Sequence, residues 1–414
     1  MLPGSGGFAQ LAQRWVTKVL KPPRHLILVE PAAGAKNGHF TEKLNLWLEG
    51  ARAAGVEVIT LVTWNEFEGP SCRVERVEVA PAMARAFGRF VPHRFKAKWA
   101  EFWTYLRAGT VSRQAKAPLI GLTASGPMSL AFAARFVRPA KWLQVVMYGG
   151  IVMIDGQPRL NDRRRREFAA LIRRGCILLC NAPATAAVLM REYQTQRFPG
   201  AVLYLPDPIF VPDFVRNSSV KKASEPFTLL VSGEENDRRT PLAHLLDAGP
   251  KTKIAKLVLH QPGKAEPVLA DGRQWVKPSA INVVEVVTDY LVGEPLVRLF
   301  ASVRCAVIVY APAFAQGSAN FALAVASGTP VLSSHFPYAE DMFRRFGRLG
   351  ELFHYGESDG FNAALGRIAL WGESEWVEFQ EARQRFIAEV EYRAVVRRTL
   401  ELAGKSSPVD QKLN

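Results

Sequence analysis

The sequence predicts an α/β protein made of two doubly wound domains that face each other across a cleft. Short runs rich in Val, Ile and Leu alternate with longer helix-like segments, and this alternation occurs twice along the chain. A Pro-rich segment at 206–226 separates the two series. Because strands buried on both faces read as continuous apolar runs, each series indicates a parallel sheet between two layers of helices. The 414 residues are enough for two or three domains of ordinary size.

The first series follows a helical segment expected at 8–20. Its apolar runs, bounded by Gly or Pro and expected as strands, are 26–30, 56–63, 119–123, 143–147, 176–180 and 202–205. Helices are expected between them at 41–54, 130–136 and 163–173. This series predicts a first domain over residues 1–215.

The second series begins after the Pro-rich segment. Its expected strands are 227–232, 255–260, 283–286, 305–310 and 330–333, and its expected helices are 241–247, 295–302 and 319–327. A long charged amphipathic stretch at 376–402 predicts a single closing helix. We therefore expect a second domain over 216–375 and a final segment, 376–414, that packs back on the first domain.

The composition is that of a folded globular protein. Hydrophobic residues make up 48% and charged residues 22% of the chain, which excludes a disordered chain, a collagen-like chain and a small disulfide scaffold. The four cysteines are too few for a disulfide framework, so we expect them to be reduced in a cytoplasmic protein. The longest uncharged stretch, 117–134, is interrupted by glycines and Pro127, so no transmembrane helix is predicted, and no signal peptide is recognised.

Positive charge is concentrated in the first half of the chain. Residues 1–215 hold 29 Lys and Arg against 15 Asp and Glu, a net charge of +14, whereas the remainder holds 24 against 23, a net charge of +1. Four consecutive arginines at 163–166 add to this positive field. The two domains are therefore expected to meet different partners.

Basic and aromatic residues are interleaved at 83–107, which holds six Lys or Arg, one acid and seven aromatics. Such a segment suits a membrane interface, where rings lie among headgroups and cations meet anionic lipid. The side chains expected to face the membrane are Arg94, Lys96, Lys98, Trp99, Phe102 and Trp103. The alternatives are a helix that packs on the core with a solvated basic face, and nucleic-acid binding, for which the sequence has charge but no motif.

A loop of small residues in the second half is a candidate phosphate site. It follows the run 305–310, contains Gly317 and Ser318, and leads into an Ala-rich helix that ends at Gly328. Exposed amides and the positive dipole end of such a helix suit a diphosphate. The alternative is an ordinary strand–helix–strand crossover with glycine at its turns.

Three segments carry a resemblance to a known family: 324–332 (AVASGTPVL), 229–233 (LLVSG) and 37–40 (NGHF). They resemble the GT-B glycosyltransferases, most closely those grouped as family 4, and the order of elements agrees over nearly the whole chain. The resemblance implies two Rossmann-like domains across a cleft, which is the GT-B fold. It also implies that the first domain binds an acceptor and that the second binds a nucleotide sugar.

The sequence departs from this family at one important point. The family carries two glutamates eight positions apart around the Gly-Ser loop, and those places hold Ala315 and Leu323 here. A leucine cannot accept a hydrogen bond from a ribose hydroxyl. Glu340 and Asp341, expected in the loop after the next strand, are candidate substitutes; the alternative is that this acidic pair caps a helix.

The resemblance also suggests which cations meet the diphosphate. Arg238 and Arg239 fall where the family places its basic residues, and Lys264 is a possible third cation. Guanidinium groups suit phosphate because they offer fork-shaped donors with a fixed charge. The alternative is a solvated arginine pair beside acids.

In the first domain, the loop 30–39 is expected to face the cleft. Gly38, His39 and Tyr148 are expected to line its acceptor side. An inverting transferase needs a base at the acceptor hydroxyl, and the candidates are His39 and Asp155. The alternative for His39 is a cleft-lining or purely structural residue.

The expected function is transfer of a sugar from a nucleotide-sugar donor to an anionic or lipid-linked acceptor, in the assembly of cell-envelope polysaccharide or another glycoconjugate. The sequence shows no Asp-x-Asp motif and no His/carboxylate cluster, so neither a metal nor another cofactor is expected. The expected location is the cytoplasm, with peripheral contact to the inner face of the plasma membrane. The alternatives are a non-catalytic scaffold of the same fold and a nucleotide-sugar epimerase, and a nucleic-acid partner is not expected.

Overall fold

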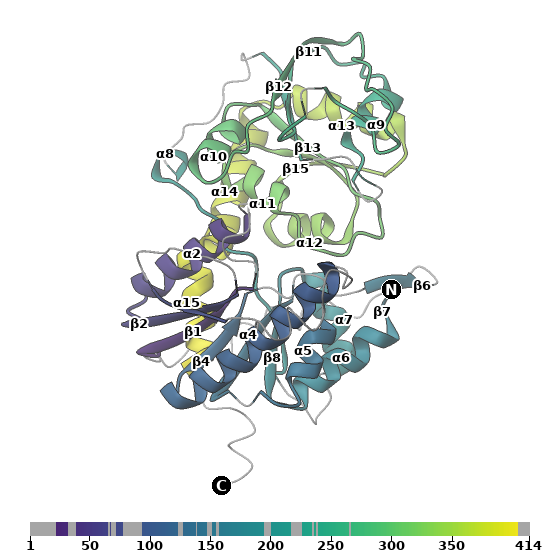
Figure 1. Cartoon of the computed structure of the whole chain (residues 1–414). Helices are drawn as coiled ribbons and strands as arrows, with labels where there is room; N and C mark the ends of the chain where they lie inside the picture. Colours follow the sequence, from purple (N-terminus) through teal and green to yellow (C-terminus); the bar gives the residue numbers. More distant parts are fainter. Residues whose placement is uncertain are drawn as a thin grey trace.

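A computed structural model of the chain describes residues 22–31, 39–64, 67, 72–77, 93–122, 127–137, 139–146, 151–154, 157–193, 200–216, 226–233, 236, 239–264 and 266–404. Two parallel sheets, each with helices around it, form two domains stacked one above the other (Figure 1). The first half of the chain forms the lower domain in this view, and most of the second half forms the upper domain. The predicted fold class is therefore confirmed.

The first domain is built on a seven-stranded sheet in the order β3-β2-β1-β4-β5-β8-β9, with every neighbouring pair parallel. Its strands are β1 (His25–Val29), β2 (Val58–Thr63), β3 (Arg73–Arg76), β4 (Pro118–Gly121), β5 (Lys141–Val146), β8 (Cys176–Cys180) and β9 (Val202–Tyr204). A separate antiparallel hairpin joins β6 (Ile151–Ile154) to β7 (Gln157–Leu160). Its helices are α2 (His39–Ala53), α4 (His93–Ala115), α5 (Pro127–Ala133), α6 (Asp162–Ile172) and α7 (Pro183–Tyr193). The short α8 (Asp213–Arg216) follows and lies against the second domain, where the Arg298 guanidinium stacks over the Phe214 ring (Figure 1).

The second domain is built on a six-stranded parallel sheet in the order β12-β11-β10-β13-β14-β15. Its strands are β10 (Thr228–Ser232), β11 (Ile254–His260), β12 (Ile281–Val287), β13 (Cys305–Ile308), β14 (Val331–Ser334) and β15 (Gly350–Phe353). Its helices are α9 (Pro241–Ala248), α10 (Glu294–Ala301), α11 (Ala319–Ala326), α12 (Pro337–Phe346) and α13 (Ser358–Ala369). The strand order reverses between β10 and β13, which is the position where doubly wound sheets bind ligands.

Alternation within the central strands explains why both faces of each sheet are covered. In β1, Ile27 and Val29 belong to one apolar cluster, whereas Leu26 and Leu28 belong to another on the opposite face. Successive side chains of a strand point to opposite faces, so a run of apolar residues requires a helical layer on each side. The continuous Val, Ile and Leu runs therefore become the buried centre of each domain.

The C-terminal segment does not form the single helix predicted from its amphipathic pattern. It forms α14 (Glu373–Val390) and α15 (Tyr392–Gly404), which are separated at Glu391, where φ is −57° and ψ is 130°. Phe386 of α14 is buried in the second domain's core, whereas α15 packs on α2 of the first domain, with Val396 against Gly50. One straight helix cannot bury its apolar face against both domains, so the chain bends where it passes from one to the other.

The two domains contact each other directly next to this crossing. The amide of Ile209 donates to the carbonyl of Val390 at 2.9 Å, and the amide of Tyr392 donates to the carbonyl of Ile209 at 3.1 Å. Ala182, which follows β8, is fully buried in an apolar cluster of the second domain. These contacts fix the carboxyl end of the first sheet against the second domain.

Candidate functional site

The candidate site lies at the carboxyl ends of β10 and β13, at the switch point of the second sheet. Three features meet there: the turn after Ser232, the residues that follow β13, and the start of α11. Asn320, in the first turn of α11, donates its side-chain amide to the carbonyl of Ser232 at 2.7 Å. This hydrogen bond ties the end of β10 to the start of α11.

The start of α11 has the geometry that the small-residue loop predicted. Ser318 is the N-cap residue, with φ −110° and ψ 109°, and its hydroxyl accepts a hydrogen bond from the amide of Phe321 at 3.2 Å. By helix geometry, the amides of Ala319 and Asn320 have no acceptor within the helix. The positive end of the helix dipole therefore lies at the sheet edge, which favours an anion.

Arg239 lies across the end of β10, next to this helix. Its side chain is only 6% exposed, its guanidinium donates to the carbonyl of Ser232, and the guanidinium carbon lies 5.8 Å from the centroid of the Tyr310 ring. Gly233 has φ +97°, and a Cβ there would overlap the Arg239 guanidinium. A solvated arginine at position 239 is therefore excluded, and the structure brings Arg239, Gly317 and Ser318 to one sheet edge. Arg238 lies outside the described residues.

Lys264 and His260 belong to the neighbouring strand at the same edge. Lys264 is half-buried in the turn after β11, where its amide donates to the carbonyl of Gln261 at 3.0 Å. Nε2 of His260 lies 3.1 Å from the carbonyl oxygen of Asp289, and because a carbonyl only accepts, Nε2 carries the ring proton. Nδ1 therefore accepts a hydrogen bond from the Ser232 hydroxyl at 3.0 Å. Burial lowers the pKa of His260, so the neutral ring holds the end of β10. His260 was not predicted as a site residue, because only its contact with Ser232 distinguishes it.

The loop before α11 is packed against the first domain. The hydroxyl of Thr185 donates to the carbonyl of the buried Ala315 at 3.1 Å, and a Cβ on Gly317 would lie 3.2 Å from the carbonyl oxygen of Asn181. Leu323 packs partly buried against the second domain's core. Ala315 and Leu323, the two positions at which the resemblance implies a glutamate, are therefore engaged in packing contacts.

The acidic pair expected in a loop lies inside α12 instead. Glu340 is exposed and pairs with Nδ1 of His335 at 3.1 Å, and the His335 ring stacks on His354 with centroids 4.5 Å apart. Asp341 is buried against Arg344, and burial raises its pKa. The N-cap of α12 is Phe336, so neither acid is the cap, and the prediction that both stand in the preceding loop is wrong. Glu340 alone remains accessible beside the carboxyl end of β14.

The described residues on the cleft side of the first domain include a polar group that was not predicted. His39 is the first residue of α2 and its side chain is not described, while Gly38, Tyr148 and Asp155 lie outside the described residues. Three other residues form a chain here: Lys43 pairs with one oxygen of Asp207, and the side-chain amide of Asn181 donates to the other at 2.6 Å. In the sequence, Asp207 shows only as an acid between two prolines, which indicates a turn and no more.

A second carboxylate of α2 reaches the upper domain. Glu42 accepts a hydrogen bond from the amide of Gly293, the N-cap of α10, at 2.8 Å. Burial raises the pKa of Glu42, and the hydrogen bond from Gly293 offsets part of this increase. This contact joins the domains on the α2 side of the molecule.

The residues expected to face a membrane are divided by the packing of α4. Phe102 is buried in the core of the first domain, so its assignment to the outer face is wrong: α4 packs against α5 and turns this ring inward. Trp99 and Lys98 are half-buried, and Trp103 is exposed. The side chains of Arg94 and Lys96 are not described.

The arginine run at the start of α6 is largely paired. Arg163 and Arg164 both contact Glu167, and Arg165 contacts Asp162 and Glu192. This is the solvated, ion-paired helix face that such a run usually forms.

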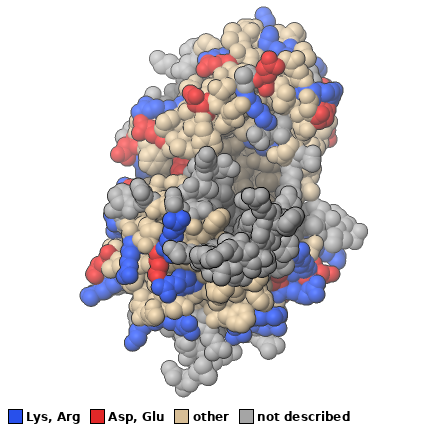
Figure 2. All heavy atoms as spheres, in the orientation of Figure 1, with Lys and Arg blue, Asp and Glu red and all other residues tan. Residues whose placement is uncertain are grey.

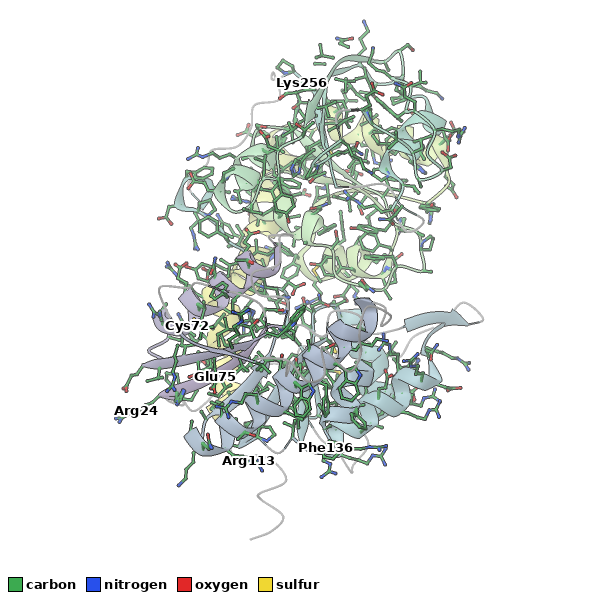
Figure 3. The ribbon with its side chains drawn as sticks, in the orientation of Figure 1. Arg24, Cys72, Glu75, Arg113, Phe136 and Lys256 are labelled. Atoms are coloured by element: carbon green, nitrogen blue, oxygen red, sulfur yellow. The ribbon has the colours of Figure 1, made fainter. Side chains whose placement is uncertain are left out.

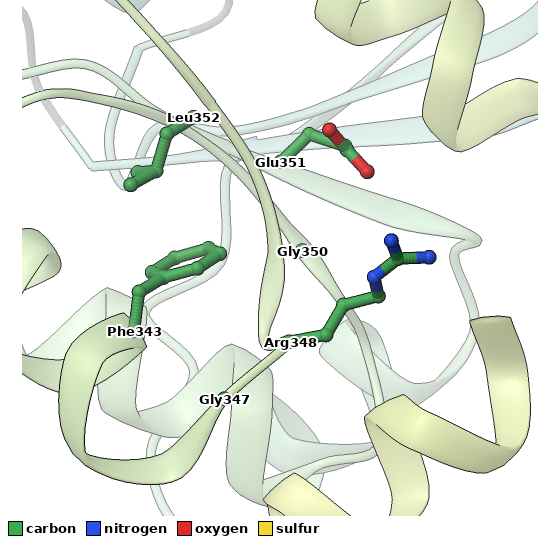
Figure 4. Close-up of a pocket in the computed structure, with 6 residues that line it drawn as sticks. All are labelled: Phe343, Gly347, Arg348, Gly350, Glu351 and Leu352. Atoms are coloured by element: carbon green, nitrogen blue, oxygen red, sulfur yellow. The ribbon is translucent and has the colours of Figure 1, made fainter.

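Two other kinds of site are not supported within the described ranges. No group of three or more His, Cys, Asp or Glu is placed to hold a metal ion among the residues that the structure describes. A shallow hollow lies at the amino end of β15, lined by Phe343, Gly347, Arg348, Gly350, Glu351 and Leu352 (Figure 4). The charged residues of this hollow are paired, Arg348 with Glu378 and Glu351 with Arg367. The hollow lies at the amino ends of the strands, whereas Ser232 lies at their carboxyl ends. It is therefore a surface depression rather than the candidate site.

Comparison with known proteins gives the fold. No family model and no curated protein matches the chain. Among solved structures, it is similar to a glycosyltransferase from Rickettsia africae ESF-5 (10% identity, TM-score 0.62, covering 92% of this chain and 97% of that one). It is also similar to sucrose-phosphate synthase from Thermosynechococcus elongatus (16% identity, TM-score 0.61, covering 91% and 98%) and to Anabaena HepE in complex with UDP and glucose (12% identity, TM-score 0.60, covering 91% and 98%). The chain therefore has the GT-B fold.

Proposed function

We propose that this protein is a nucleotide-sugar-dependent glycosyltransferase whose donor diphosphate binds at the carboxyl ends of β10 and β13. One observation carries the proposal: the buried Arg239 and the start of α11 meet at the switch point of the second sheet. A guanidinium and a helix N-terminus both favour an anion, and together they suit a group with two phosphates. Similar GT-B structures support a transferase as the activity.

The donor proposal begins with uridine nucleotides. HepE, one of the similar proteins, has been solved with UDP and with UDP-glucose. In this chain, Arg239 and the first amides of α11 would hold the diphosphate, with Lys264 as a further cation at the same edge. As the sugar leaves, negative charge increases on the diphosphate, so donors already in place stabilise the transition state more than the ground state. No metal ion is part of the proposal.

The acceptor is proposed to be anionic or lipid-linked. The first domain, on the other side of the cleft, carries the net charge of +14, which favours an anionic partner. Another similar structure, WaaG, is described as a glycosyltransferase involved in lipopolysaccharide biosynthesis (12% identity, TM-score 0.55). This supports a role in cell-envelope polysaccharide or glycoconjugate assembly. His39 and Asp155 remain the candidates for a base at the acceptor hydroxyl.

Nucleotide binding provides the test. We would measure the melting temperature of the purified chain with UDP, GDP, ADP, CMP, dTDP and their common sugar conjugates, because a ligand of the folded state raises it. Arg239→Gln should abolish the shift, and Lys264→Gln should reduce it. The matched control is Arg273→Gln, an exposed arginine of the same domain that pairs with Asp271. Circular dichroism establishes that each variant is folded.

A non-catalytic scaffold is the second candidate, and the packed loop favours it. Ala315 and Gly317 are held against Thr185 and Asn181 of the first domain, in the loop where the resembling family binds its donor sugar. A scaffold of this kind would melt cooperatively and show no shift with any nucleotide. A shift that Arg239→Gln removes would exclude it.

A further inference from the structure

Three exposed aromatic side chains gather on the first domain, away from the candidate donor site. They are Trp103 of α4, 38% exposed, Phe132 of α5, 44% exposed, and Phe136 in the turn after α5, 56% exposed. We call these three residues the aromatic surface. Large apolar side chains exposed singly are common, but a contiguous group of them marks an interaction site.

Ring contacts show that the aromatic surface is one continuous feature. The buried Phe102 lies beneath it, with its ring centroid 5.5 Å from that of Trp103, 5.1 Å from that of Phe132 and 6.3 Å from that of Phe136. Phe132 and Phe136 also contact each other edge to face, with centroids 5.5 Å apart. The exposed rings are therefore held in position by a ring that belongs to the core.

Among the residues that the structure describes, the exposed charges on α4, α5 and the turns after them are all basic. The guanidinium carbon of Arg135 lies 5.9 Å from the centroid of Phe132, and Arg113 and Lys116 are exposed at the end of α4. The only carboxylate in the described residues of α4 and α5 is Glu101, which is buried. Of these described cations, Arg107 pairs with Glu75 of β3.

This face points away from the second domain. Phe136 and Arg113 both lie on the lower side of the first domain in Figure 3, remote from the sheet edge that holds Arg239. In the space-filling view, Lys and Arg gather along this lower rim, with few Asp or Glu between them (Figure 2). A partner bound here would leave the cleft between the domains accessible.

We propose that the aromatic surface docks on an anionic lipid bilayer. Trp and Phe rings lie among lipid headgroups at membrane interfaces, and nearby Arg and Lys are attracted to anionic lipids. A second copy of this chain fits less well, because it would bring the same positive charge against itself. The described helices do not include one that is both long enough and apolar enough to cross a membrane. Contact at the surface of the bilayer is thus the form of attachment proposed.

This inference goes beyond the proposed glycosyl transfer and does not depend on it. A protein that transfers no sugar would still carry the aromatic surface, and a transferase without it would still bind its nucleotide. The two proposals therefore need separate assays: vesicle binding for this one and nucleotide binding for the other.

The test is co-sedimentation of the full chain with vesicles of phosphatidylcholine alone and of phosphatidylcholine mixed equally with phosphatidylglycerol. We expect binding to the mixed vesicles only. The double variant Phe132→Ser/Phe136→Ser should bind roughly tenfold or more weakly, because two interfacial side chains are lost. Arg113→Gln/Lys116→Gln should weaken binding by roughly fivefold for each charge removed.

The matched control is the double variant Val276→Ser/Leu370→Ser, which removes two apolar side chains that are even more exposed, on the second domain. It should bind mixed vesicles as the unaltered chain does. Because the substituted residues are at the surface, all variants should remain folded and melt cooperatively, with a modest decrease for Phe132→Ser/Phe136→Ser, which loses ring contacts to Phe102.

Four outcomes would overturn the proposal. The first two are that the unaltered chain does not bind mixed vesicles, or binds vesicles of phosphatidylcholine alone equally well. The other two are that Phe132→Ser/Phe136→Ser binds mixed vesicles as the unaltered chain does, or that the control Val276→Ser/Leu370→Ser loses as much binding as this variant. A fifth comes from light scattering: a dimer that this double variant dissociates would make the aromatic surface a contact between copies.

Discussion

Gly233 controls the position of Arg239, so Gly233→Ala should damage both stability and nucleotide binding. Gly233 has φ +97°, where a residue with a Cβ is strained by about 1 to 2 kcal/mol. The new Cβ would also overlap the guanidinium of Arg239 and force it away from the carbonyl of Ser232. Loss of a hydrogen bond to a buried charged group costs about a further 1.5 to 3 kcal/mol.

Gly272→Ala is the matched control. Gly272 has φ +84°, so the backbone strain is similar, but no atom lies within 4 Å of the position of its Cβ. We expect Gly233→Ala to lower the free energy of unfolding by about 2.5 to 5 kcal/mol and Gly272→Ala by about 1 to 2 kcal/mol. Urea denaturation followed by circular dichroism measures both values. Equal losses in the two variants would refute the role assigned to the Arg239 contact, and so would unchanged nucleotide binding in Gly233→Ala.

Three further predictions concern the core, the contact between domains and the sheet edge. Phe379→Ala, at a fully buried ring of α14, should lower the free energy of unfolding by about 3 to 5 kcal/mol in urea denaturation; a loss below about 1 kcal/mol would contradict the packing described. Because burial raises the pKa of Glu42 above its ordinary 4.5, its contribution to stability is greatest below that pH and is lost as pH rises through the folded value. Glu42→Gln keeps an acceptor for the Gly293 amide, so it should raise the melting temperature above that of the unaltered chain at pH 7. At pH 4 the two melting temperatures should be equal. A lower melting temperature of the variant at pH 7 would contradict this prediction. The pKa of His260 is lowered from its ordinary 6.5, so its contribution is present above that pH and is lost as pH falls through the folded value. In His260→Asn, the melting temperature should therefore decrease less as the pH falls below 6.5. The same decrease as in the unaltered chain would show that His260 does not contribute to the acid sensitivity.

The sheet cores were predictable from the sequence because buried parallel strands leave a strong pattern. Continuous Val, Ile and Leu runs, as in β1 and β10, have few alternatives to a strand covered on both faces. The edge strand β3 has the sequence RVER and was not predicted, since an edge strand need not be apolar. The closing helix was predicted as one piece because its amphipathic pattern continues through Glu391, and only the presence of two separate domains requires the bend there.

The location of the candidate site, at the carboxyl ends of the strands of the second sheet, was predictable from the sequence. The family resemblance assigned Arg239 to the donor diphosphate, and the small-residue loop assigned Gly317 and Ser318 to it; the rule that ligands bind beyond the carboxyl ends of strands explains why the three lie together. The same rule could not show that Asn320 and His260 fasten the end of β10, because these are contacts of side chains across neighbouring elements. Helical periodicity places aromatic residues on α4, but it cannot tell which of them α5 will cover. For this reason Phe102 was assigned to the outer face, and Phe132 and Phe136 were not considered.

Hydrogen–deuterium exchange locates the donor site in the full chain. It is measured with and without the nucleoside diphosphate that gives the largest thermal shift. Bound donor should slow exchange in peptides covering 229–240 and 310–322, which contain the end of β10 and the start of α11. It should leave peptides over 343–352, around the hollow at β15, unchanged. Protection that leaves both of these peptides unchanged, or no protection with any nucleotide at saturating concentration, would contradict the claim that the carboxyl ends of β10 and β13 form the donor site.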